Sequence, residues 1–113
     1  MITRIWQAWS TPKNADEYER RLTTEIFPAI RRKGIDGLRN MEVLRRDAGE
    51  EVEFVVLFRF TDLDSVRQMA GPDAEVAFVP DIARQVLKRF EDRARHFESR
   101  HSVSHVEEMP DAR

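Results

Sequence analysis

Ten consecutive residues in the middle of the chain constrain its fold more than any other stretch. Residues 51–60 read EVEFVVLFRF, and every even position among them is apolar. Successive side chains of a β-strand point to opposite faces of the sheet, so this pattern predicts a strand with one fully apolar face. Val55 and Leu57 make the middle of the other face apolar as well. The stretch therefore predicts a strand that is covered on both sides.

A second strand is predicted at the N-terminus. Residues 2–10 are rich in β-branched and aromatic residues and precede Thr11-Pro12, which favours a turn. Both tryptophans of the chain, Trp6 and Trp9, lie in this stretch and are three positions apart. In a strand they point to opposite faces. One indole should pack against the helices and the other should face a ligand or partner, and the alternation alone does not decide which.

A long helix should follow this strand. Asn14 and Glu17 are spaced for a capping box, and apolar residues then recur at helical spacing up to Ile30. Pro28 lacks an amide donor and crowds the preceding turn, so a kink or a break is expected there. Gly34 is placed to end the helix in a left-handed conformation.

The rest of the chain predicts one hairpin, further helical segments and a polar strand. The expected elements are a strand over 38–46, a hairpin turn over 47–50, the strand over 51–60, a short helix over 63–70 capped by Thr61 or Asp62, a helix from Pro80 through Phe90 and a polar strand over 92–99. Residues 1–100 would form a single domain, and residues 101–113, which lack periodicity, a C-terminal tail.

The order of these elements, β-α-β-β-α-β, is typical of the ferredoxin-like α+β fold, a four-stranded antiparallel sheet with its helices on one face. Such a sheet leaves its second face to water. Here Val55, Leu57 and one tryptophan would lie on that face, and a contiguous apolar patch marks a partner or a ligand. We therefore expect a homodimer in which two sheets pack face to face around a cavity.

Composition narrows the classes of function. The chain has 19 Lys and Arg residues against 21 Asp and Glu residues, and they are interspersed, so no face for a nucleic acid is predicted. It has no cysteine, which excludes disulfides, thiolate metal ligands and cysteine nucleophiles. No apolar run approaches the ~20 residues of a membrane span. We expect a cytoplasmic protein with neither a nucleic-acid nor a membrane partner.

Two side chains are candidates for catalysis. His96 lies within the polar strand, where an imidazole could exchange protons near neutral pH or simply hydrogen-bond a neighbour at the dimer seam. Arg59 ends an otherwise apolar row and could hold an oxyanion or pair with a surface acid such as Glu53. His101 and His105 lie in the expected tail without a third ligand, so no metal site is predicted.

Three segments carry a resemblance to a known family. They are ITRIW at residues 2–6, GEEVEFVVLFRF followed by TDLDSVRQMAG at residues 49–71, and VPDIARQVLKRFEDRARHFE at residues 79–98. In these segments the chain resembles the antibiotic-biosynthesis-monooxygenase-like group of the dimeric α+β barrel superfamily. The resemblance implies a dimeric α+β barrel over about the first hundred residues. It is less specific for a reaction, because that superfamily includes oxygenases, haem degraders, dehydratases, isomerases and proteins without an assigned activity.

The resemblance also implies one candidate activity. In cofactor-independent members, polar side chains position a phenolic polycycle whose anion reacts with dioxygen. By residue type, the matching roles here are His96 as proton acceptor, Arg59 and Gln7 as oxyanion ligands, and Trp6, Trp9 and Phe97 as the apolar lining for an aromatic or polyketide-like substrate. Neither a metal nor another cofactor is implied. Haem degradation is disfavoured, because Gln7 and Phe60 stand where those relatives have Asn and Trp. The alternative is a non-catalytic ligand-binding or structural dimer.

Overall fold

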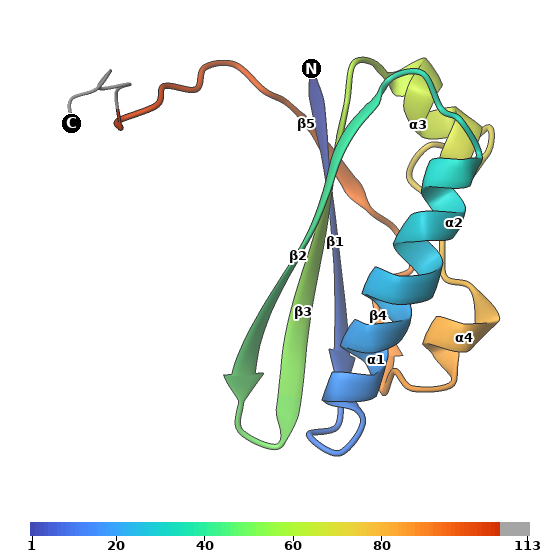
Figure 1. Cartoon of the computed structure of the whole chain (residues 1–113), viewed down its shortest axis with the longest axis vertical. Coiled ribbons are helices and arrows are strands. Elements are labelled where there is room, and N and C mark those ends of the chain that lie inside the picture. The colour runs from blue at the N-terminus through green and yellow to red at the C-terminus, as the bar shows by residue number, and fades with distance from the viewer. Residues whose placement is uncertain (107–113) are drawn as a thin grey trace.

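The computed structural model describes residues 1–106 and contains one antiparallel sheet with its helices on one side (Figure 1). Its elements are β1 (Ile2–Ser10), α1 (Ala15–Arg21), the π-helical turn η1 (Leu22–Ile26), α2 (Phe27–Arg32), β2 (Leu38–Ala48), β3 (Glu51–Phe60), α3 (Leu63–Ala70), α4 (Asp81–Arg84), β4 (Arg89–Phe90) and β5 (Arg95–Glu98).

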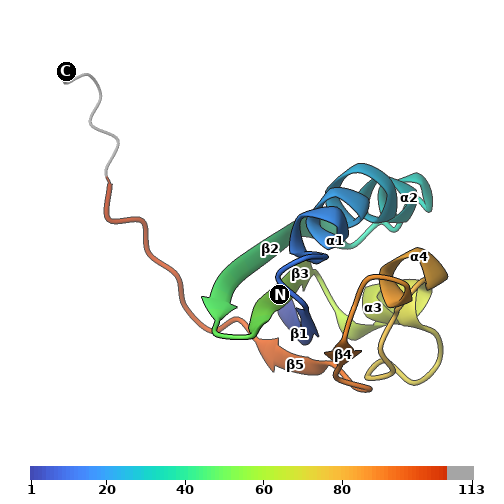
Figure 2. The ribbon, with the colours of Figure 1, turned by 90° about the horizontal axis from the view of Figure 1, so that it is seen from below.

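The strand order is β2-β3-β1-β4, and β5 also pairs with β1. β4 pairs with Ala8 and Trp9, whereas β5 pairs with residues 2–5 of the same strand. The strand expected over residues 92–99 is present as β5, and the additional short strand β4 comes from residues predicted to be helical; both lie along one edge of β1, which makes a five-stranded sheet. The order agrees with the predicted ferredoxin-like α+β fold, and Figure 2 shows the helices gathered on one face of the sheet.

The alternation in β1 and β3 is confirmed by the burial of their side chains. In β3 every even position is buried and every odd position is half-buried. Trp6 is paired with Val56 and is only 6% exposed on the helix side, whereas Trp9 lies on the open face of the sheet. The tertiary structure thereby decides which tryptophan anchors the sheet to its helices.

The first helix differs from its prediction at both the cap and the proline. Asn14 occupies the N-cap position but its side chain makes no capping bond, and Glu17 instead accepts hydrogen bonds from Arg20 and Arg21. Pro28 does not break the helix, because the π-helical turn η1 precedes it and the chain continues into α2. A wider turn relieves the crowding that proline causes in regular α-helix. Gly34 follows the helix with a φ of 65°, as predicted.

The helix predicted from Pro80 through Phe90 is wrong over its second half. α4 begins after Pro80 but ends at Arg84, and residues 88–91 run along the edge of β1 instead. There the Lys88 amide donates to the Trp9 carbonyl at 2.7 Å and the Glu91 amide to the Gln7 carbonyl at 3.0 Å. The unpaired edge of β1 offers these backbone partners, and tertiary pairing outweighs the helical periodicity.

The segment after β5 leaves the body of the domain. The Ser99 amide still donates to the Met1 carbonyl, but residues 100–106 then extend away from the sheet (Figures 1 and 2). They form neither helix nor strand, and residues 107–113 of the predicted tail lie outside the described part of the chain. No helix within residues 1–106 is long and apolar enough to cross a membrane.

Candidate functional site

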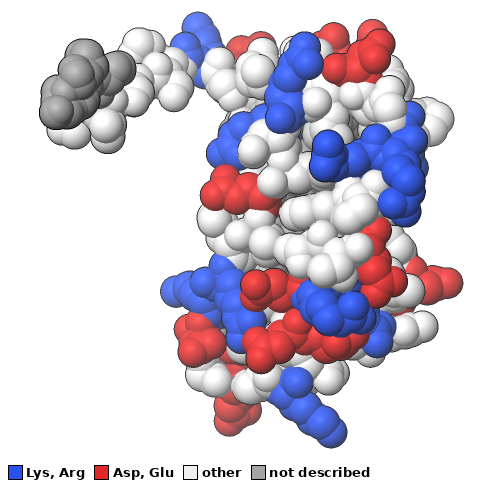
Figure 3. All heavy atoms as spheres, viewed as in Figure 1, with Lys and Arg blue, Asp and Glu red and all other residues white. Residues whose placement is uncertain are grey.

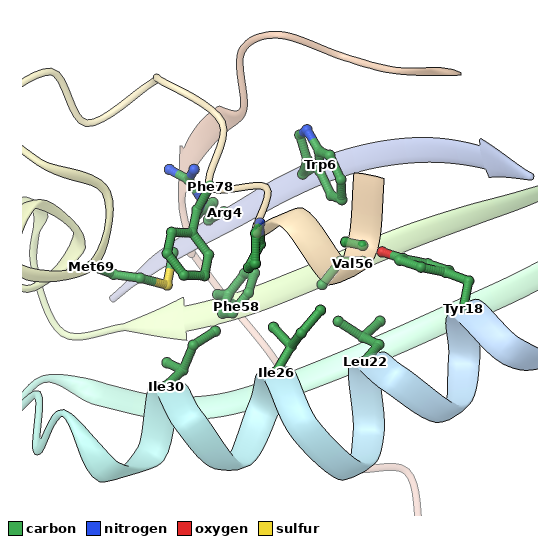
Figure 4. Close-up of a pocket in the computed structure, with 12 residues that line it drawn as sticks. Arg4, Trp6, Tyr18, Leu22, Ile26, Ile30, Val56, Phe58, Met69 and Phe78 are labelled. Carbon is green, nitrogen blue, oxygen red and sulfur yellow. The ribbon is translucent and has the colours of Figure 1, made fainter. Parts of the chain in front are cut away.

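A narrow cavity lies between the sheet and the helices. β1 and β3 form its floor, while aliphatic side chains of the first helix, the sulfur-bearing Met69 and the ring of Phe78 enclose it (Figure 4). Its volume is about 20 Å³, on the order of one water molecule. The lining is apolar except for two side chains, Arg4 and Tyr18. An apolar lining with a few polar groups is typical of a small-molecule site, but the space is far smaller than the roughly 300–1,000 Å³ of such sites.

Tyr18 supplies the first polar group. Its side chain is 1% exposed and packs edge-on against Phe54, with ring centroids 4.8 Å apart. Burial raises the pKa of the Tyr18 hydroxyl above its usual range, so the group stays protonated at neutral pH. Figure 4 shows the hydroxyl directed into the cavity; it makes no side-chain hydrogen bond within residues 1–106, where no polar side-chain atom is both fully enclosed and unpaired. A bound molecule could complete its hydrogen bonding.

Arg4 supplies the second polar group, and it is among the largest fully buried side chains, at 1% exposed. Its Nη1 donates to the Ala74 carbonyl at 2.6 Å and its Nη2 to the Val76 carbonyl at 2.9 Å. Both carbonyls belong to the irregular segment between α3 and α4. Burial lowers the pKa of the guanidinium to about 10, which still leaves it charged at neutral pH.

His96 lies directly behind Arg4. Its Nε2 is 3.0 Å from Arg4 Nη1, and because a guanidinium can only donate, Nε2 accepts and the imidazole is neutral. Burial and the charge of Arg4 lower the pKa of His96, and Glu75 opposes this weakly. β5 brings the two residues together, since Arg4 and His96 are paired across the strands.

The neutral state of His96 predicts a pH dependence of stability. A histidine whose pKa is lower in the folded protein contributes stability above its unfolded pKa, near 6.5, and that contribution is lost as pH falls. We expect the free energy of unfolding to decrease between pH 7 and pH 5 in the wild type. His96→Gln should flatten this slope, whereas His101→Gln, at an exposed position, should leave it unchanged. Urea unfolding at several pH values measures this, and equal slopes in wild type and His96→Gln would contradict the assignment.

The structure divides the sequence-predicted site residues between two faces of the sheet. Trp6 and His96 lie on the helix side, and Trp6 lines the cavity and donates from Nε1 to the Glu91 carbonyl at 2.7 Å. The residues on the open face are Gln7, Trp9, Arg59 and Phe97. The six side chains therefore do not meet in one cavity of a single chain.

Those on the open face have structural partners. Gln7 donates to Glu53 at 2.6 Å, and Arg59 donates to Asn40 and Glu42, not to Glu53. The guanidinium of Arg89 lies 3.8 Å from the centre of the Trp9 ring, as in a cation–π contact. Phe97, the fourth of these residues on the open face, is 48% exposed.

Sequence reasoning missed Arg4 and Tyr18 as site residues. Tyr18 fits the apolar spacing of the first helix, and Arg4 is one polar residue in a strand, so residue type alone singled out neither. A signal was present, since Arg4 shares the buried face of β1 with Trp6 and Ala8. A charged residue in an otherwise buried row is unusual and marks a position worth testing.

A second, open groove runs between β2 and α2, where Figure 3 shows uncharged surface between clusters of charged side chains. Phe27, Leu38 and Met41 contribute to its lining. Its polar lining residues are all exposed: Thr23, Arg31, Arg39 and Asn40. Because the groove places no buried polar group against a ligand, it is the weaker candidate.

Comparison with known proteins supports the fold. No protein-family model and no curated protein matches the sequence. Among solved structures, the chain is similar to an ethyl tert-butyl ether D (EthD) family protein from Bacillus halodurans C-125, with 16% sequence identity and a TM-score of 0.55. The match covers 88% of this chain and 100% of that chain. The chain has a ferredoxin-like α+β fold. Membership of the antibiotic-biosynthesis-monooxygenase-like group and of the dimeric α+β barrel superfamily stays a prediction.

Proposed function

We propose that this protein binds an aromatic small molecule in the cavity between its sheet and its helices. The observation that carries the proposal is the hydroxyl of the buried Tyr18 side chain, which faces an apolar cavity and makes no side-chain hydrogen bond to the described residues. A ligand that pairs with this hydroxyl gains one hydrogen bond, which contributes about 0.5–1.5 kcal/mol. The rings of Trp6, Phe58 and Phe78 suit an aromatic molecule.

Binding of the neutral probe 2-naphthamide, followed by calorimetry, tests this proposal. Ala83 lines the cavity, so Ala83→Leu should fill it and abolish binding. Ala29→Leu, at an exposed position of α2, should bind like the wild type. Tyr18→Phe should weaken binding about 2- to 10-fold, the usual worth of one hydrogen bond. Equal affinity in wild type and Ala83→Leu would exclude this cavity as the site.

Cofactor-independent oxygenation is a second candidate, favoured by the neutral imidazole of His96 next to Arg4. His96 would accept a proton from the substrate, and Arg4, rather than the distant Arg59, would hold the resulting oxyanion. With anthrone, deprotonation of the methylene, reaction with one O₂ and loss of one water would give anthraquinone. Anaerobic mixing followed by air tests this, and unchanged product formation by His96→Ala would contradict the role of His96.

We also propose that the open face of the sheet pairs with a second copy of the chain. Ile5 and Val55 lie there beside Leu57, and Leu44, which pairs with Val55, is 45% exposed. Burying this apolar row is worth about 25 cal/mol per Å². The extended residues 100–106 leave from the same region and would reach the partner.

A charge on this face should prevent the pairing. Leu57→Glu should sediment as a monomer at micromolar concentration, because association would bury an unpaired carboxylate. Leu63→Glu, at an exposed leucine of α3, is the matched control and should stay dimeric. A wild type that sediments as a monomer would contradict the dimer, while binding of 2-naphthamide in the cavity could still occur.

A further inference from the structure

We propose that the molecule bound in the cavity carries a carboxylate that pairs with Arg4. This inference rests on the proposed function and specifies the chemical class of its ligand. The structural basis is a fully buried guanidinium that lines the cavity and has no acidic partner among the described residues.

The charge of Arg4 is the first step of the argument. Buried charges in proteins are paired or hydrogen-bonded by several groups, because removal from water is costly. The partners of Arg4 are two carbonyl oxygens and a neutral imidazole, none of which carries a negative charge. Glu75, the carboxylate that acts on His96, is exposed and pairs with Arg93 at 3.4 Å. An anion at Arg4 would supply the missing counter-charge.

The donors of Arg4 are the second step. A guanidinium has five N–H groups. Bonds to Ala74, Val76 and His96 engage three of them. The Nε–H and one Nη2–H donate to no atom of the described residues, so the guanidinium keeps donors that a carboxylate could use.

Access to the cavity is the third step. A cavity of about 20 Å³ is too small for an aromatic ring, so a ligand must displace part of the lining. Phe78 and Pro80 belong to the irregular segment that Arg4 holds through the Ala74 and Val76 carbonyls. A carboxylate that competes for Arg4 would loosen these bonds and let Phe78 move aside. Recognition of the anion and enlargement of the cavity thus involve the same side chain.

Calorimetry with a matched pair of probes tests the inference. 2-Naphthoate and 2-naphthamide have the same rings and differ in charge. We expect the wild type to bind 2-naphthoate about 10-fold or more tightly than 2-naphthamide, because hydrogen bonds to charged groups are stronger. Arg4→Gln should bind the two probes with about equal affinity. Arg84→Gln, at an exposed arginine of α4, should keep the preference for 2-naphthoate.

A second measurement needs no variant of Arg4. NMR titration of His96 in the wild type should show its pKa rise when 2-naphthoate binds, because the anion offsets the charge of Arg4. 2-Naphthamide should cause no such rise.

The outcomes separate this inference from the proposed function. If 2-naphthamide binds in the cavity and 2-naphthoate binds no better, the carboxylate is excluded and the aromatic site stands. A preference that survives Arg4→Gln, or an unchanged pKa of His96, would also overturn the role of Arg4. If neither probe binds, the proposed function fails and this inference fails with it.

Discussion

Replacing Trp6 with alanine should lower the free energy of unfolding by about 3–5 kcal/mol, a large part of the 5–15 kcal/mol of an ordinary domain. Trp6 is 6% exposed, packs 6.0 Å from the ring of Phe90 and forms one wall of the cavity. Its removal leaves a hole in the centre of the core that the sheet cannot close. Urea unfolding with linear extrapolation measures the loss.

Trp6→Phe separates packing from hydrogen bonding at this position. Phenylalanine keeps most of the apolar contact but leaves the Glu91 carbonyl without the donor that now lies at 2.7 Å. We expect this variant to lose about 1–3 kcal/mol, less than the alanine variant. A cost below about 1 kcal/mol for Trp6→Ala would contradict the placement of Trp6 in the core.

Gly37→Ala should lower the free energy of unfolding by about 3 kcal/mol, nearly as much as Trp6→Ala. Gly37 is buried where the turn before β2 meets the start of α3, and its carbonyl accepts from the Thr61 amide at 2.8 Å. A methyl group there would overlap the hydroxyl oxygens of Ser65 and Thr61 and lie 2.6 Å from Ser65 Cβ. Relieving the overlap would disturb the cap of α3, where Asp62 accepts from the Ser65 amide at 2.9 Å.

Gly34→Ala is the matched control, because it adds the same methyl group at a position where the cost comes from backbone strain and not from steric overlap. Nothing lies within 4 Å of a Cβ at this position, but its φ of 65° strains any L-residue with a side chain. The expected loss is about 1 kcal/mol. Thermal unfolding of the two variants compares them, and equal shifts would contradict the steric explanation for Gly37.

Local patterns predicted the fold because they reflect the burial of whole elements. The alternation in β1 and β3, the hairpin between residues 38 and 60, and the Asp62 cap of α3 all agree with the structure. Each depends on neighbours within a few residues, which a single sequence displays directly. The patterns failed where a distant partner decides, as at residues 88–91, which pair with β1 instead of continuing α4.

The candidate site was predicted only in part, for the same reason. The sequence placed the site residues in a cavity between two sheets, whereas Trp6 lines the cavity between sheet and helices, and Arg59 and Gln7 have partners on the open face of the sheet. Residue type indicated which side chains have useful chemistry, but did not indicate which face each strand turns toward the helices. Arg4 and Tyr18, 14 positions apart, face one cavity because helix and sheet pack together.

The sequence by itself determined that one face of β3 is apolar along its length and the other in its middle, and that Trp6 and Trp9 point in opposite directions, because the period of a strand fixes both. Only the tertiary structure decided that Trp6 faces the helices, that β4 and β5 share the edge of β1, and that Arg4 is buried without an acidic partner among the described residues. These features depend on contacts between segments as far apart as β1 and β5. A periodic sequence pattern does not indicate such contacts, because they form only when distant segments pack together.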